Sequence, residues 1–134
     1  MEDFVTFEIA KKLKEKGFPQ SPDCFNYSSY YDWDGLRKIH SLSNASVWFD
    51  PNISRDNIYF APIISQVLKW LREKKNMHII VEISDSGWYY TLYSNVRCLN
   101  DKLKSDTYIM SFKHKTSYEQ AALAGIEYVL DNLI

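Results

Sequence analysis

The sequence predicts an α+β fold: an antiparallel sheet of at least three strands with two main helices packed on one face, plus an N-terminal helix and hairpin. Two segments, one in the middle of the chain and one at its end, carry apolar residues at the i, i+3, i+4, i+7 spacing of a helix. The segments between them alternate apolar and polar residues, as half-buried strands do. A chain of 134 residues suits one hydrophobic core, so a single domain over 1–134 is expected.

The N-terminal helix is predicted within residues 4–18. Thr6 can accept a hydrogen bond from a free amide of the first turn, and Glu8 suits the positive end of the helix dipole. Gly17 can adopt the left-handed conformation that closes a helix. Both ends of this helix are therefore marked in the sequence.

A hairpin is predicted next, with residues 25–31 and 36–42 as its strands, and residues 46–49 as a further short strand. The hairpin is rich in aromatic residues, which make up 16% of the chain. Alternation along a strand sends only about half of its side chains inward, so some rings should remain outside. These rings are expected either to contribute to a protein partner or self-association surface or to cover the sheet edge of a monomer. The residues of this predicted surface are Tyr27, Tyr30, Tyr31 and Trp33.

The central helix is the best marked element. Pro62 has no amide hydrogen and a preset φ, so the helix should begin between Ala61 and Ile64. Asn76 is a reasonable stop after the basic last turn. The predicted buried face carries Ile64, Val67, Leu68 and Leu71, and the opposite face carries Ser65, Lys69, Arg72 and Glu73.

Three strands are predicted between the two main helices, the first two joined by a turn at 84–87 and the third preceded by a polar loop at 98–106. In the C-terminal helix, Thr116 and Glu119 are predicted to form a capping box. Small residues around Gly125 should allow a close approach to the sheet. The predicted strands comprise residues 77–83, 88–93 and 107–113.

The composition excludes several classes of protein. With 46% apolar and 25% charged residues the chain should fold, and 16 basic against 17 acidic residues argue against a dedicated nucleic-acid neutraliser. Cys24 and Cys98 form no CxxC pair, and the longest apolar run, 58–64, is too short to cross a bilayer. A cytoplasmic protein without membrane association is expected.

No catalytic, cofactor-binding or metal-binding residues are predicted, and neither is a small-molecule ligand. The four glycines are scattered singly, whereas a phosphate-binding loop needs several together. His40, His78 and His114 match no metal-ligand spacing. An enzyme is accordingly the alternative that the sequence supports least.

The segments TFEIAKKLKEKGF, FAPIISQVLKWLREK and TSYEQAALAGIEYVLDNLI resemble a group of small uncharacterised proteins of gut anaerobic bacteria and their phages or mobile elements. Where that group often has a threonine after Ala-Pro, this chain has Ile63. The resemblance implies a compact α+β domain and a genomic setting, and no activity. We therefore expect a non-catalytic interaction or accessory protein.

The order helix, strand, strand, strand, helix also resembles the double-stranded-RNA-binding domain, which makes a nucleic-acid-binding module the alternative. Lys113 and Lys115 precede the final helix, roughly where that family places lysines that contact phosphates. Glu119 in the first turn departs from the pattern, because its carboxylate would face the phosphates.

Overall fold

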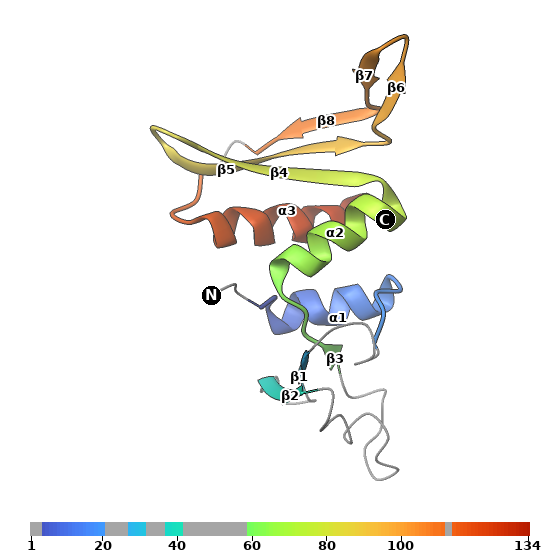
Figure 1. The fold of residues 1–134 in the computed structure, drawn as a ribbon. Helices are drawn as coiled ribbons and strands as arrows, with labels where there is room; N and C mark the ends of the chain where they lie inside the picture. The colour runs from blue at the N-terminus through green and yellow to red at the C-terminus, as the bar shows by residue number, and fades with distance from the viewer. Residues whose placement is uncertain (1–3, 21–26, 32–36, 42–58, 112–113) are drawn as a thin grey trace. The chain divides into compact units, whose positions relative to one another are not determined.

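The computed structural model describes residues 4–20, 27–31, 37–41, 59–111 and 114–134 (Figure 1). The chain divides into two compact units, one formed by Phe4–Ile63 and the other by Met1–Asp3 with Ile64–Ile134. The single domain expected over 1–134 stays a prediction.

In the first unit, helix α1 spans Phe7–Glu15 and has the predicted ends. The Ile9 amide donates to the Thr6 hydroxyl oxygen at 3.3 Å, and Gly17 has a φ of 92°. Leu13 and two neighbours one turn earlier are buried, which gives the helix one apolar face.

The predicted hairpin is also confirmed: strands β1 (Tyr27–Tyr31) and β2 (Arg37–Ser41) pair antiparallel. The sheet has a third strand, β3 (Tyr59–Phe60), which the sequence analysis did not predict. Because this strand has only two residues, it leaves no periodic signal in the sequence. The predicted turn at 32–35 and strand at 46–49 lie outside the described residues.

In the second unit, an antiparallel sheet of order β4-β5-β8 carries both main helices on one face (Figure 1). This arrangement confirms the predicted α+β fold. Its elements are α2 (Ile64–Lys75), β4 (Met77–Ser84), β5 (Gly87–Ser94), β6 (Arg97–Leu99), β7 (Lys102–Lys104), β8 (Thr107–Met110) and α3 (Tyr118–Asn132).

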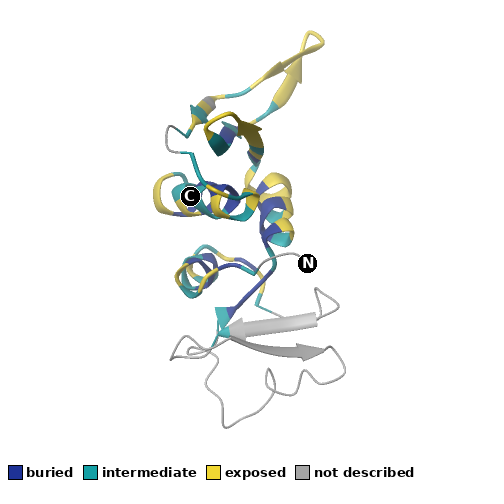
Figure 2. Cartoon of the chain, turned by 90° about the vertical axis from the view of Figure 1, so that its left-hand side faces the viewer, coloured by how far each residue is buried: buried dark blue, intermediate teal, exposed yellow. Residues whose placement is uncertain are grey.

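The core of this unit lies between the sheet and the helices, where Figure 2 shows their buried residues. The buried and exposed faces predicted for α2 are confirmed. Gly125 of α3 marks the closest approach: a Cβ there would lie 2.9 Å from Cγ2 of Ile79 and 3.2 Å from Cγ of Tyr90. The small residue thus makes room for side chains of the sheet.

The predicted cap of the last helix is wrong by one residue. The Ser117 hydroxyl accepts from the Gln120 amide at 3.2 Å, and the Gln120 side-chain oxygen accepts from the Thr116 hydroxyl at 2.7 Å. Two adjacent residues that both cap helices well leave the start ambiguous in the sequence.

The predicted polar loop at 98–106 is wrong as well, because β6 and β7 pair there as a hairpin. Its two-residue turn is Asn100-Asp101, with φ values of 51° and 63°. Asn and Asp tolerate this left-handed conformation, which a tight hairpin turn requires at both positions. Strands of three residues with no glycine between them are too weak a pattern to recognise.

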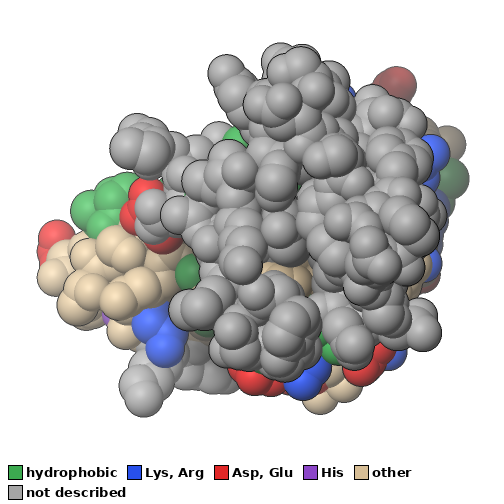
Figure 3. All heavy atoms as spheres, turned by 90° about the horizontal axis from the view of Figure 1, so that it is seen from below, with side chains coloured by type: hydrophobic (Ala, Val, Ile, Leu, Met, Phe, Trp, Pro, Cys, Tyr) green, Lys and Arg blue, Asp and Glu red, His purple; other side chains and the backbone are tan. Residues whose placement is uncertain are grey.

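Charged side chains of both signs reach the surface. Figure 3 shows described acidic and basic side chains next to one another at the lower rim of the view, as expected for a formal net charge of −1. In the described ranges no helix has the length and apolar character needed to cross a membrane. Nor do three or more His, Cys, Asp or Glu side chains gather there as a metal site would require.

Candidate functional site

The face of the β4-β5-β8 sheet that the helices leave uncovered is the candidate site, and we call it the open face. Ile79, Tyr90 and Leu92 are buried, so their neighbours along each strand lie on the opposite face. The pairing register aligns these neighbours in rows across the three strands. The open face carries His78, Ile80, Glu82, Tyr89, Thr91, Tyr93, Tyr108 and Met110.

Apolar side chains are exposed on the open face to an unusual degree. The exposed fractions are 44% for Ile80, 59% for Tyr108 and 42% for Met110. The rings of Tyr93 and Tyr108 lie side by side, with centroids 5.2 Å apart. Soluble monomers rarely leave a contiguous apolar patch uncovered unless it binds something.

A pocket of about 400 Å³ opens at one end of this face. Its walls are mainly apolar, and a basic side chain, Lys104, stands among them. The lining residues are His78, Ile80, Tyr93, Val96, Leu103, Lys104 and Ser105. Residues from β4, β5 and the β6–β7 hairpin thus form one concave site.

The β6–β7 hairpin is exposed along its length (Figure 2). Leu103 is 76% exposed and Leu99 is 49% exposed. Leucines on an exposed hairpin, one of them lining the pocket, extend the apolar surface of the open face.

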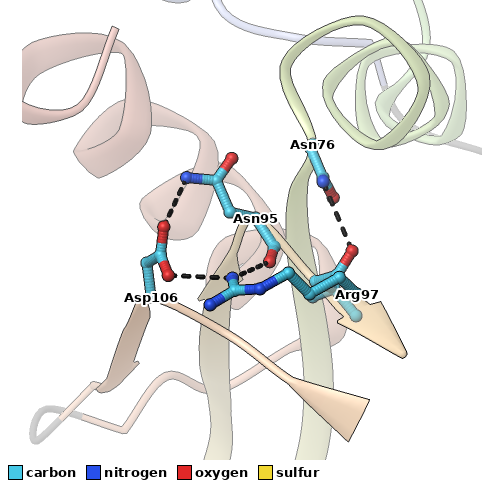
Figure 4. A network of polar contacts seen from close by, with 5 residues as sticks. Asn76, Asn95, Arg97 and Asp106 are labelled. Atoms are coloured by element: carbon cyan, nitrogen blue, oxygen red, sulfur yellow. Dashed lines mark hydrogen bonds and ion pairs between the residues drawn. The ribbon is translucent and has the colours of Figure 1, made fainter. Parts of the chain in front are cut away.

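A network of polar contacts holds the base of this hairpin (Figure 4). The Asp106 carboxylate accepts from the Asn95 side-chain amide and from the Arg97 guanidinium, both at 2.8 Å. Arg97 also donates to the Asn95 carbonyl at 2.9 Å, and the Asn76 side chain donates to the Val96 carbonyl at 3.4 Å. The hydrogen bond from Asn95, followed by that from Arg97, lowers the pKa of Asp106.

At the other end of the open face, the Tyr89 hydroxyl donates to the Glu82 carboxylate at 2.9 Å. This hydrogen bond raises the pKa of Tyr89, because ionisation of the phenol would remove the donor and bring two negative charges together. The open face is therefore polar near the β4–β5 turn and apolar toward the pocket.

The residues predicted as a partner surface belong to the first unit, whereas the open face belongs to the second. The Tyr31 ring is half-buried in the first unit: its hydroxyl donates to the Val5 carbonyl at 2.6 Å, and its ring packs edge-on against Phe7 at 5.5 Å. Tyr27 and Tyr30 lie in β1, but their side chains are not among the described parts of the structure. Trp33 lies outside the described residues. A partner surface at these four residues stays a prediction.

The lysines of the nucleic-acid alternative are not shown as a pair. Lys113 lies outside the described residues. Lys115 is half-buried, and its amide donates to the Trp88 carbonyl at 2.7 Å. Phosphate contact at these lysines also stays a prediction.

The sequence analysis missed the open face and its pocket. The alternating pattern of β4 was visible, but Ile80 falls on the polar phase of that strand, and an exposed apolar residue there is the signal that was available. Comparison of the chain with family models, with curated proteins and with solved structures finds no match. Among the described residues, the fold and this surface define an α+β protein with an uncovered sheet face that is apolar toward its pocket end.

Proposed function

We propose that this chain is a non-catalytic interaction protein that binds a protein partner on the open face. The observation that carries the proposal is the exposed apolar cluster beside the pocket, on the sheet face opposite the helices. Binding energy at protein interfaces concentrates in a few large side chains that fill well-packed pockets. A pocket of about 400 Å³ has room for one bulky apolar side chain of a partner.

The charges around the pocket describe the partner further. Lys104 lines the pocket, and Lys102 is exposed on the same hairpin. Charged groups at the rim of an interface steer association and select complementary partners. We therefore infer a partner segment with an apolar anchor flanked by acidic residues. We also propose that this interaction protein is an accessory protein of a phage or mobile element, as the sequence resemblance implies.

Photo-crosslinking tests this assignment. A photoreactive amino acid replaces Leu103, and in a control chain it replaces Lys69, which is exposed on α2 away from the sheet. We expect a protein of the source cell to crosslink to the first position and not to the second.

The captured protein is then purified and titrated with variants. Leu103→Asp should weaken binding by about 30-fold, the loss that corresponds to about 2 kcal/mol at an interface hot spot. Lys69→Asp should change it less than about twofold. Equal crosslinking at both positions, or equal affinity of both variants, would show that the partner binds elsewhere.

A nucleic-acid-binding module is the second candidate, and the order α2, β4, β5, β8, α3 is the observation that favours it. Against it stand the half-buried Lys115 and the acidic Glu119 in the first turn of α3. We expect no binding of RNA or DNA tighter than about 10 μM at physiological salt. Sub-micromolar binding that weakens steeply with salt would replace the first proposal by this one.

A further inference from the structure

The outer edge of β4 is a second unassigned surface, and it borders the open face. β4 has eight residues, Met77–Ser84, and among the described strands it pairs with β5 alone. All eight are in continuous register with β5, so the strand has no bulge, and it contains no proline. Natural proteins protect exposed edges by such devices or cover them, because an open edge is a template for another strand.

The hydrogen bonds of β5 show which groups of β4 face outward. The Trp88 amide donates to the Lys115 carbonyl at 2.9 Å, and the Tyr90 carbonyl accepts from the Ser111 amide at 2.9 Å. The main-chain amides and carbonyls of the even-numbered residues of β5 thus point toward β8 and the segment after it. Its odd-numbered residues turn toward β4, where they pair with even-numbered residues. The amides and carbonyls of Ile79, Val81 and Ile83 therefore point away from the sheet.

We propose that the protein forms a symmetric dimer in which β4 pairs antiparallel with β4 of a second copy, with Ile80 opposite Ile80. In this register the outward-facing groups of Ile79 meet those of Val81, so the amides and carbonyls of both chains are paired. His78 lies opposite Glu82 on both sides of the axis, and an imidazole can donate to a carboxylate. Ile83 lies opposite Met77.

The pattern of β4 selects this register over its neighbours. Shifting the axis by one residue in either direction places His78 opposite Ile80 or Ser84 and leaves Glu82 without its counterpart. A hydrogen-bond donor and an acceptor that face each other across a strand pair are favourable, and apolar side chains pack in like pairs. The exposed fractions of 65% at Ile83 and 44% at Ile80 mark apolar surface that pairing would cover. A second copy is thus the occupant that fits this edge, with apolar residues opposite apolar residues and His78 opposite Glu82.

The dimer would join two sheets into one of six strands and place the two open faces in a continuous surface. This inference does not rest on the proposed partner, since it uses only the main chain and side chains of β4. The edge residues His78 and Ile80 also line the pocket, but the two ideas fail separately because the partner test changes Leu103, which is not part of β4, and the dimer test needs no partner.

Disulfide trapping of the full chain tests the register. In a background with Cys24→Ser and Cys98→Ser, Ile80→Cys should form a linked dimer with oxidised glutathione as the oxidant. Opposed residues of a non-hydrogen-bonded pair have Cα atoms about 4.5 Å apart, within the range of a disulfide. Ile83→Cys is the matched control: it is more exposed, but its copies would lie about 20 Å apart across the axis.

Sedimentation equilibrium supplies the second measurement. The wild type should dimerise with a dissociation constant below about 300 μM. His78→Glu should weaken the dimer about tenfold, because the introduced carboxylate of each copy would then lie opposite Glu82 of the other and the like charges repel at both places. Adding Glu82→His to that variant should restore it. A wild type that stays monomeric at about 300 μM overturns the proposal. Equal crosslinking at both cysteine positions would also overturn it, as would a dissociation constant that is the same in the wild type, in His78→Glu and in the double variant.

Discussion

Leu71 of α2 provides the sharpest test of how the helices pack on the sheet. Its side chain is fully buried, at 0% exposed. Leu71→Ala removes three carbon atoms from the core, which costs about 2.4 kcal/mol of transfer free energy at about 0.8 kcal/mol per methylene. The cavity left behind raises the expected loss to between about 2 and 5 kcal/mol. Arg72→Ala, the next residue on the exposed face, should change stability by less than about 0.5 kcal/mol.

Urea denaturation followed by far-UV circular dichroism measures both variants. For a slope of about 1 to 3 kcal/mol/M, a loss of about 3 kcal/mol lowers the midpoint by about 1 to 3 M for Leu71→Ala. The Arg72→Ala midpoint should match the wild type. Coincident midpoints for the two variants would mean that the assigned buried face of α2 is incorrect.

Three further outcomes are expected. Ser117→Ala should cost about 1 kcal/mol by removing the cap on the Gln120 amide, while Glu119→Ala should cost clearly less; a thermal melt showing the reverse order would restore the capping box first predicted. Gly125→Leu should destabilise the protein by more than about 2 kcal/mol because the side chains of Ile79 and Tyr90 occupy the space beside Gly125. Ala124→Leu, at a partly exposed site, should be tolerated. Equal melting temperatures of the two variants would contradict this packing. In an NMR titration the Asp106 carboxyl should have a pKa below its ordinary value. Its contribution to stability should therefore be complete above about pH 4 and be lost as pH falls through the folded-state pKa. Asn95→Ala should raise the pKa of Asp106, and an unchanged titration would rule out the network of Figure 4 as the cause of the lowered pKa.

Local chemistry was enough to predict the main elements. The cap at Thr6, the glycine after α1, the proline before α2 and the apolar spacing along α2 and α3 each act within a few residues. Such short-range signals are written in the sequence, because hydrogen bonding and side-chain periodicity at this scale do not depend on distant parts of the chain. The α+β class followed from the order of these elements.

Assembly of the second unit decided the rest. The sequence shows that β4 alternates, but only the pairing order β4-β5-β8 makes β4 an edge and leaves Ile80 on a face without helices. The pocket needs residues from β4, β5 and the β6–β7 hairpin, which are up to 27 positions apart between His78 and Ser105. Contacts at such separation depend on which strands pair and on how the hairpin is held, and no local pattern encodes either. The candidate surfaces of this protein are therefore properties of its tertiary structure, whereas its helices and most of its strands are properties of neighbouring residues.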